Sequence, residues 1–242
     1  VGDDLDDSLT ESFRSMYGKI QMNSHATGSK SILVTSAIPS EGKSLISANF
    51  AHTCANHGSK TILIDFDLRR PGLHNFCDES NDEGVMTILN TPNATEEEVT
   101  DKLKKVLCSI HPNLFLLPSG GKTRAATEII EKKEFELLLT CLKKLADVVI
   151  FDSPPAGLFP DSIALARKTD EVLFVTRYGK VSRQVVKRLI GDLKATGANI
   201  LGVILNDLPS KKATGYYYSG YYGYGYYRYK YYSKYYSPTE DS

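Results

Sequence analysis

The chain has 242 residues, of which 41% are hydrophobic and 24% charged, the balance of a folded globular protein. Its 29 Lys and Arg equal its 29 Asp and Glu, so overall charge does not favour nucleic acid or an anionic membrane, and we expect no nucleic-acid partner. The longest apolar runs are strand-sized, which excludes a membrane-spanning helix.

The N-terminal segment "VGDDLDDSLTESF" is acidic, lacks the apolar core of a signal peptide and begins without Met, which indicates an internal or trimmed boundary. After it, Leu9, Phe13, Met16 and Ile20 recur at spacings of four, three and four. This period predicts an amphipathic helix over about residues 8–22.

Short apolar runs then alternate with helical stretches. The predicted strands are "SILVTS", "KTILIDFD", "NLFLLPS", "DVVIFD", "EVLFVT" and "NILGVILND". The predicted helices cover about residues 44–57, 96–108, 125–144, 160–168 and 182–196. Strands that are apolar throughout and are separated by helices indicate a doubly wound α/β domain with a mostly parallel sheet. Ligands of such a domain bind beyond the carboxyl ends of the strands.

The four cysteines, Cys54, Cys77, Cys108 and Cys141, lack the spacing of metal ligands. We interpret them as reduced thiols in a cytosolic compartment, each serving as a small core hydrophobe.

The periodic pattern stops after Leu208, which predicts a domain over residues 1–208 and a flexible tail over residues 209–242. Thirteen of the fifteen tyrosines lie in this tail. They are Tyr216, Tyr217, Tyr218, Tyr221, Tyr222, Tyr224, Tyr226, Tyr227, Tyr229, Tyr231, Tyr232, Tyr235 and Tyr236. A low-complexity aromatic segment that is disordered or self-associating is one interpretation.

The segment "SAIPSEGKS" follows the first strand and opens a helix, as a phosphate-binding loop does. Ala37 stands where the strict pattern has Gly, but Gly42, Lys43 and Ser44 are in place. Gly42 lets backbone amides close around an anion, Lys43 neutralises phosphates, and the Ser44 hydroxyl can bind Mg²⁺. Taken alone, "GKS" is equally consistent with a chance turn before a helix.

Three carboxylates follow strands at the same expected edge of the sheet. Asp65 and Asp67 come at the end of "ILIDFD" and share one side of the strand if it continues that far, and Asp152 ends "VVIFD". Carboxylates gathered beside a phosphate loop would repel one another unless a divalent cation lay among them. A set of Asp residues capping helices is the alternative.

These three segments together resemble the Walker A, A′ and B motifs of the bacterial tyrosine kinases, the BY-kinases of capsule and exopolysaccharide synthesis. The resemblance extends to "ESFRSMY", "LNDL" and the tyrosine cluster. It implies a P-loop NTPase-like fold and an autophosphorylating protein-tyrosine kinase that uses ATP and Mg²⁺. The tyrosine cluster is then the kinase's own substrate.

The resemblance also implies roles for single residues. The catalytic residues would be Lys43, Asp65, Asp67 and Asp152, with Asp65 as the base or, in exchange, Asp67. Mg²⁺ would be held by Ser44, Asp67 and Asp152. The nucleotide would be bound by Ser40, Glu41, Gly42, Lys43, Ser44, Leu45 and Asn206. Arg69 and Arg70 either stabilise phosphate charge, join a subunit contact or form an exposed basic turn.

Partners are implied in the same way. The family's Glu-x-x-Arg-x-x-Arg motif for oligomerisation is matched by Glu11 and Arg14, but Tyr17 replaces its last Arg. A ring-like homo-oligomer is expected, together with a membrane polysaccharide co-polymerase adaptor as activator, a tyrosine phosphatase and protein substrates. The kinase would be cytoplasmic and recruited by the adaptor to the inner face of the membrane.

Two other functions compete with this one. A partition or septum-positioning ATPase shares the deviant loop and the fold, but its second lysine is replaced here by Ile38. A nucleotide-binding scaffold that binds nucleic acid through its tail rests on "YYRYKYYSKYY" alone.

Overall fold

Strands and helices alternate along the chain, as the apolar pattern predicts. The computed structural model describes residues 7–23 and 28–208. The strands within them are β1 (Lys30–Ser36), β2 (Thr61–Asp65), β3 (Cys108–His111), β4 (Leu114–Leu117), β5 (Val148–Asp152), β6 (Glu171–Arg177) and β7 (Ile200–Asn206). The helices are α1 (Asp7–Asn23), α2 (Lys43–Asn56), α3 (Leu73–Cys77), α4 (Val85–Leu89), α5 (Glu96–Val106), α6 (Ala126–Ile130), α7 (Lys133–Leu145), α8 (Asp161–Ala166) and α9 (Arg183–Ala195).

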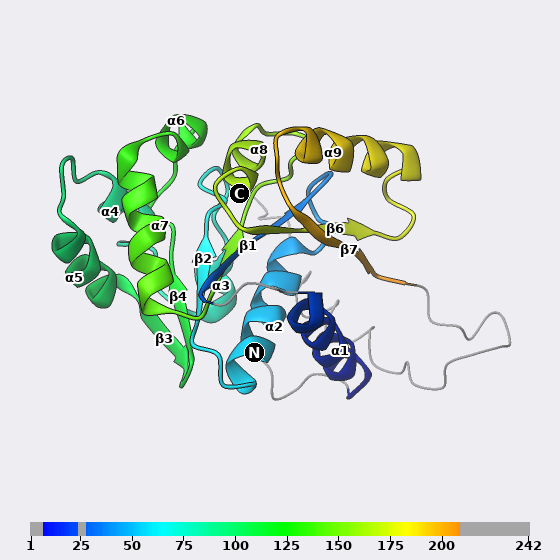
Figure 1. Cartoon of the computed structure of the whole chain (residues 1–242), viewed down its shortest axis with the longest axis horizontal. Helices are drawn as coiled ribbons and strands as arrows, with labels where there is room; N and C mark the ends of the chain where they lie inside the picture. The colour runs from blue at the N-terminus through cyan, green and yellow to red at the C-terminus, as the bar shows by residue number, and fades with distance from the viewer. Residues whose placement is uncertain (1–6, 24–27, 209–242) are drawn as a thin grey trace, which may run out of the picture.

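The seven described strands form one sheet in the order β3-β4-β2-β5-β1-β6-β7 (Figure 1). All neighbouring strands are parallel except β3 and β4, which form an antiparallel edge. Strands β1, β2 and β5 are buried almost throughout because helices cover both faces of the sheet. This confirms the predicted doubly wound α/β fold with a mostly parallel sheet.

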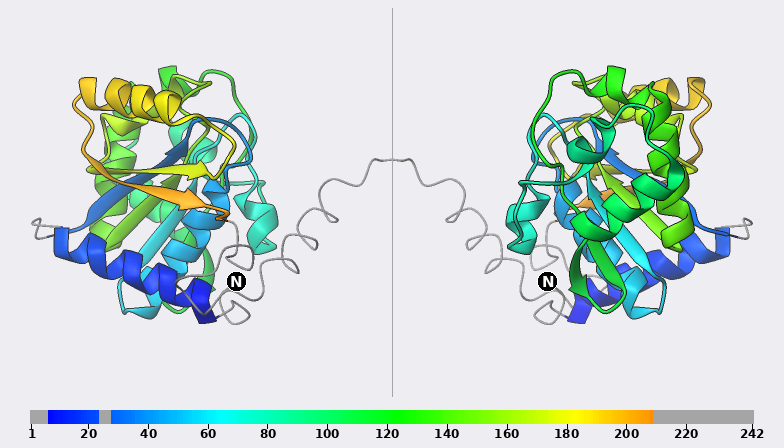
Figure 2. Two further views of the ribbon diagram at one scale, coloured as in Figure 1. Left: turned by 90° about the vertical axis from the view of Figure 1, so that its right-hand side faces the viewer. Right: turned by 90° about the vertical axis from the view of Figure 1, so that its left-hand side faces the viewer.

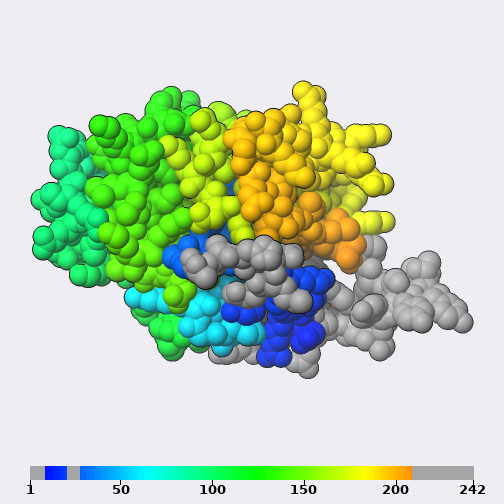
Figure 3. Space-filling view, in the orientation of Figure 1, coloured from blue at the N-terminus to red at the C-terminus, as the bar shows by residue number. Residues whose placement is uncertain are grey.

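The helices divide into two layers (Figure 2). Helices α1, α2 and α3 pack on one face, where Phe13 and Phe50 join a buried cluster with Ile150 of the sheet. Helices α4 to α9 supply the cluster on the other face, which contains Phe135 and Phe151. In the space-filling view the green and yellow surface of this second layer lies above α1, in dark blue (Figure 3). The sheet is thereby fixed between two apolar layers.

Three details differ from the sequence prediction. The helix expected over 125–144 is two helices, α6 and α7, because α6 turns to contact α8 while α7 packs on α5. The helix expected to reach residue 108 ends at Val106, and Cys108 begins β3, a half-buried edge strand whose pattern is too short to recognise. The five-residue helices α3 and α4 were not predicted. By contrast, α1 confirms the helix predicted over 8–22.

The cysteines differ among themselves. None of the four forms a disulfide, and Cys54 and Cys141 are buried as predicted. Cys77 and Cys108 are half-buried and pack against the margin of a core cluster rather than inside it.

No helix in the described part of the chain is long and apolar enough to cross a membrane. The predicted tail over 209–242, with its tyrosines, lies outside the described residues, so the division of the chain at residue 208 remains a prediction.

Candidate active site

The segment from Ser36 to Ser44 runs from the end of the central strand β1, through a loop over residues 37–42, into the start of helix α2. Gly42 is left-handed, with φ 93°, and its backbone oxygen accepts the first helical hydrogen bond of α2, from Ile46. A Cβ at Gly42 would lie 2.2 Å from Nδ2 of Asn206. Only glycine combines this backbone angle with so little space. The loop therefore leads directly into the N-terminus of α2, where backbone amides attract anions.

Glu41 holds the loop in shape from the inside. Its buried carboxylate accepts hydrogen bonds from the backbone amides of Ala37 and Ile38 at 2.8 and 2.9 Å. Its other oxygen accepts from the Thr176 hydroxyl and the Arg177 amide, which belong to β6. Both carboxylate oxygens of Glu41 thus accept two hydrogen bonds each from the protein itself, and only the backbone of Glu41 remains to bind a ligand.

Asn206, the last residue of β7, closes the same loop. Its Nδ2 donates a 2.9 Å hydrogen bond to the backbone oxygen of Glu41. Its Oδ1 accepts from the amide of Asp207. The structure therefore places Asn206 at the phosphate loop with its amide engaged by the protein, and its predicted contact with a nucleotide stays a prediction.

Lys43 and Ser44, at the start of α2, lie beside Asp152. The Ser44 hydroxyl donates to Oδ2 of Asp152 at 2.6 Å, and the Ser47 hydroxyl donates to Oδ1 at 3.0 Å. Ser47 was missed by the sequence analysis, although its place one turn after Ser44 puts it on the same face of the helix. Lys43 is buried with only 8% exposure, so its charge acts within the site.

Asp65 and Asp67 point to different surroundings. Strand β2 ends at Asp65 and does not continue to Asp67, so they do not share one side of a strand as expected. Oδ2 of Asp65 accepts from the amides of Gly72 and Leu73, both at 2.9 Å, whereas its Oδ1 is buried with no hydrogen-bond partner among the described residues. Oδ1 of Asp67, a half-buried residue in the following loop, accepts from the Arg70 amide at 3.0 Å.

Burial and mutual repulsion disfavour the ionised forms of these acids. Burial, followed by the nearby charge of Asp152, raises the pKa of Asp65 to about 8. Burial raises the pKa of Asp152 to about 6, although Lys43 and the hydroxyls of Ser44 and Ser47 lower it. Burial also raises the pKa of Asp67, against the effects of the Arg70 amide and of Lys43. Folding without a cation therefore disfavours the ionised carboxylates, and a bound metal ion would favour them.

The site suits a nucleotide with Mg²⁺. In the described residues the carboxylates do not form a ready group of three that could hold a metal ion alone. Mg²⁺ typically uses one or two carboxylates, a hydroxyl, phosphate oxygens and water. Ser44, Asp152 and Asp67 supply such donors, and the unpartnered Oδ1 of Asp65 is a further buried acceptor.

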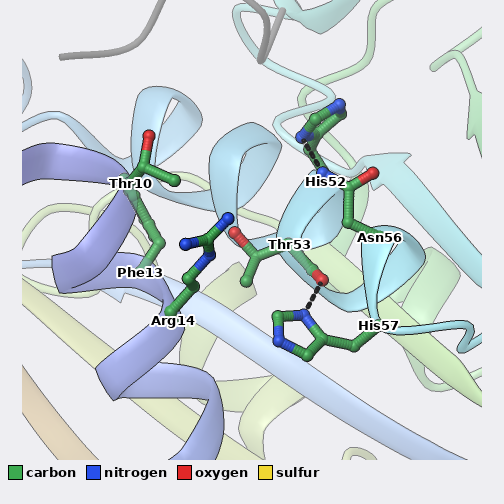
Figure 4. Close-up of a pocket in the computed structure, with 7 residues that line it drawn as sticks. All are labelled: Thr10, Phe13, Arg14, His52, Thr53, Asn56 and His57. Carbon is green, nitrogen blue, oxygen red and sulfur yellow. Dashed lines mark hydrogen bonds between the residues drawn. The ribbon is translucent and has the colours of Figure 1, made fainter. Parts of the chain in front are cut away.

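The predicted oligomerisation residues lie elsewhere, on α1. Glu11 and Arg14 form an exposed ion pair of 3.8 Å. Tyr17, which replaces the last Arg of the motif, stacks on His57 with ring centroids 4.3 Å apart. Arg14 and His57 also line a pocket between α1 and the far end of α2 (Figure 4). Thr10, Phe13, His52, Thr53 and Asn56 complete its lining. The pocket residues of α2 lie about two and a half to four helical turns from the phosphate loop, so the pocket is no part of the active site.

Known proteins of similar sequence decide the family. The chain is 30% identical over 218 residues to the putative tyrosine-protein kinase CapB of Staphylococcus aureus, covering 90% of this chain and 92% of the relative. This chain belongs to the bacterial tyrosine kinase family. The kinase is also 33% identical over 181 residues to the tyrosine-protein kinase CpsD of Streptococcus pneumoniae serotype 4, covering 74% of this chain and 76% of the relative. No family model matches the chain.

Solved structures agree. The kinase domain of the Escherichia coli tyrosine kinase ETK matches with a TM-score of 0.77 and 27% identity, over 89% of this kinase and 82% of that chain. The chimerical protein CapA2B2 matches with a TM-score of 0.74 and 30% identity, over 83% of this kinase and 85% of that chain. A ParA family ATPase from Chlorobium tepidum, at 22% identity and a TM-score of 0.60, shares the fold alone. The kinase is thus a P-loop tyrosine-protein kinase, and the rival ATPase switch is not supported.

Proposed function

We propose that this kinase transfers the terminal phosphoryl group of ATP to the tyrosines of its own C-terminal cluster and thereby regulates capsule or exopolysaccharide synthesis. The observation that carries this proposal is the meeting of Lys43, Asp65, Asp67 and Asp152 beside the phosphate loop in a tyrosine kinase whose sequence ends in thirteen tyrosines. The names of the relatives CapB and CpsD support the link to capsule synthesis.

Each site residue has a role in this proposal. The backbone of residues 40–45 and Lys43 would bind the phosphates, and Ser44, Asp67 and Asp152 would hold Mg²⁺. When bound, Mg²⁺ and ATP supply the phosphoryl group and the positive charge that offsets its negative oxygens. Asn206 keeps the loop closed at Glu41, and its expected contact with the nucleotide would share this same amide.

Asp65 accepts the tyrosine proton. A free Asp and a phenol differ by about six pKa units, so Asp65 does not deprotonate the tyrosine in advance. In a loose transition state the proton leaves late, so a carboxylate that orients the hydroxyl and takes the proton as the new bond forms is sufficient. Asp67 is the alternative base because it is less buried than Asp65.

The proposal requires the tail to reach this site. Asn206 ends β7 at the sheet edge that carries the phosphate loop. A random-coil segment of about 14 residues spans about 20 Å. The length of the tail alone does not distinguish phosphorylation within one chain from phosphorylation between neighbouring chains of the expected ring. In that ring we assign Glu11 and Arg14 to contacts between subunits.

The remaining assignments concern partners. We assign the activator role to the cytosolic part of a membrane polysaccharide co-polymerase, which would bring a cytoplasmic kinase to the inner face of the membrane. A tyrosine phosphatase would reverse the reaction, and other proteins would serve as further substrates. The similarity to the chimerical protein CapA2B2 supports a paired arrangement of kinase and adaptor.

Mass spectrometry of the purified protein after incubation with Mg²⁺ and ATP, with an adaptor fragment added, tests the proposal. We expect phosphates between Tyr216 and Tyr236, their loss in Lys43→Met and their retention in Lys187→Met, an exposed lysine of α9. ATP hydrolysis that is equal with and without residues 210–242, with no phosphotyrosine even when the adaptor is present, would refute it.

A further inference from the structure

Arg69 is bound by a carboxylate outside the set already described. It lies two residues after Asp67, in the loop that follows β2. Its Nε donates to Oδ2 of Asp161 at 2.5 Å, and its Nη2 donates to Oδ1 at 3.0 Å. The Asp161 side chain is 1% exposed and the Arg69 side chain 21%. A buried two-point ion pair of this kind fixes both position and orientation.

Other contacts brace the same pair. The Thr127 hydroxyl of α6 donates to Oδ1 of Asp161 at 2.6 Å. The guanidinium of Arg69 lies 4.7 Å from the centre of the Phe159 ring, which precedes α8. The amide of Thr123 donates to the backbone oxygen of Leu68 at 2.8 Å. The loop that carries Asp67 is therefore held from two sides.

The segment that carries Asp161 is itself attached to the phosphate loop. It begins at Asp152, and the amide of Ala156 donates to the backbone oxygen of Ser36 at 2.8 Å. A Cβ at Gly157 would lie 2.2 Å from the backbone oxygen of Ala37, so the two segments are in direct backbone contact. Asp161 is thus held in place relative to Lys43 and Asp152. Because Arg69 binds Asp161 and lies two residues after Asp67, the ion pair ties the loop of Asp67 to the same segment.

The neighbouring Arg70 has no such arrangement. It is exposed and forms no ion pair in the part of the chain that the structure describes. The two adjacent arginines therefore differ in their surroundings, and the guanidinium of Arg69 is bound by Asp161 rather than open to a phosphate.

We propose that Arg69 and Asp161 are positioning residues that hold the Asp67 loop against the phosphate loop in the geometry needed for phosphoryl transfer. The inference rests on the proposed function of Asp67. Displacing a group by about 1 Å can cost about 100-fold in rate, whereas nucleotide binding depends mainly on residues 40–45. The pair should therefore affect kcat much more than nucleotide affinity.

Four variants test the pair: Arg69→Gln, Asp161→Asn, their double variant and Arg69→Lys. The measurements are kcat for phosphotyrosine formation, the Kd of fluorescent ADP and residue-level hydrogen exchange. Arg70→Gln reports the effect of losing a positive charge from the same loop. Lys143→Gln breaks the partly buried pair with Asp170, which binds Ser31 at the start of β1, and reports general destabilisation.

The positioning role predicts that Arg69→Gln and Asp161→Asn each lower kcat about 10- to 100-fold, with the Kd of ADP changed by less than about threefold. The double variant should be no worse than either single variant, since both break one interaction. Arg69→Lys should recover part of kcat. The amides of Arg70 and Gly72, which bind Asp67 and Asp65, should exchange faster in both single variants but not in Arg70→Gln.

Three results would overturn the inference. If Asp161→Asn keeps full activity while Arg69→Gln loses it, Arg69 acts directly on phosphate. If kcat, Kd and melting temperature fall in the same proportion, as in Lys143→Gln, the pair is only structural. Unchanged exchange of the two amides would show that the loop does not depend on the pair. Absence of phosphotyrosine from the wild type would instead refute the proposed function, and the exchange and Kd measurements would still test the pair.

Discussion

Asp65 and Asp152 occupy the same register position on the adjacent strands β2 and β5. Both carboxylates are buried at the edge where these parallel strands end. Their closeness contributes to the raised pKa of Asp65, after burial. Two acids of the active site are thus placed where they repel each other, which costs stability unless a cation binds.

The first prediction concerns the stability of the metal-free protein. Asp65→Asn and Asp152→Asn should each raise the free energy of unfolding by about 1 to 3 kcal/mol at neutral pH while abolishing phosphoryl transfer, since each removes a carboxyl group whose ionised form is disfavoured in the folded protein. Thermal unfolding in EDTA measures this effect. Asp170→Asn is the contrasting control: burial opposes the ionised form of Asp170, but bonds from Lys143 and Ser31 outweigh it and lower its pKa, so this variant should be destabilised. Destabilisation of all three variants would contradict the prediction.

A second prediction follows for pH. A carboxyl group whose pKa is raised by folding binds its proton more tightly in the folded state, so stability falls as pH rises from about 4, the unfolded pKa, through the folded value. For Asp152 and Asp65 these folded values are about 6 and about 8. Urea unfolding without Mg²⁺ should therefore show lower stability at pH 8 than at pH 5. The slope should be smaller in the double variant Asp65→Asn/Asp152→Asn, and an equal slope would argue against this origin.

The third prediction concerns Glu41. Glu41→Gln should destabilise the protein by about 2 to 4 kcal/mol and weaken ADP binding, because an amide group would face donors that now share a buried carboxylate. Denaturant unfolding and fluorescent ADP titration measure the two effects. Glu131→Gln, which disturbs only an exposed pair with Arg167, should change stability by less than about 0.5 kcal/mol. Equal results for the two variants would mean that Glu41 does not support the loop.

The fourth prediction concerns Gly42. Gly42→Ala should weaken ADP binding at least about tenfold, since alanine is strained at φ 93° and its Cβ would overlap Asn206. Gly191→Ala in α9 meets open space and should instead stabilise the helix by about 0.5 to 1 kcal/mol. Titration with fluorescent ADP and thermal unfolding distinguish the two sites. Unimpaired ADP binding by Gly42→Ala would show that the loop tolerates a side chain.

The fifth prediction concerns the phosphorylated tail. Phosphates on six tyrosines would add about −9 to −12 charges, opposed by Arg228, Lys230 and Lys234. We expect such a tail to leave the carboxylate-rich site of a neighbouring subunit and the oligomer to loosen. Multi-angle light scattering before and after phosphorylation measures the mass. An unchanged mass after full phosphorylation would speak against this regulation.

Much of the site could be predicted from the sequence because its signals are local. Gly42, Lys43 and Ser44 are adjacent, and the acids Asp65 and Asp152 end strands whose apolar runs are unmistakable. In a parallel sheet, all such strand ends meet at one edge. The order of residues along the chain is then enough to predict that they come together.

The helix near 125–144 shows where local signals fail. Its apolar period continues across Glu131 and Lys132, but packing of α6 on α8 and of α7 on α5 breaks it in two. That break places Thr127 beside Asp161. The break depends on which helices α6 and α7 pack against, and the apolar pattern of the segment itself does not show it.

The sequence alone determined the fold class, the phosphate loop and the edge of the sheet at which the acids gather, since periodicity and chain order are sufficient for these. Only the tertiary structure decided what each side chain binds there. It turned Glu41 inward, joined Asn206 to the loop, separated the surroundings of Asp65 and Asp67, and paired Arg69 with Asp161. The bonds of Arg69 to Asp161, of Glu41 to Thr176 and of Asn206 to Glu41 join residues 92, 135 and 165 positions apart in the sequence, and the separation of Asp65 from Asp67 depends on the exact end of a strand. No local pattern encodes such contacts.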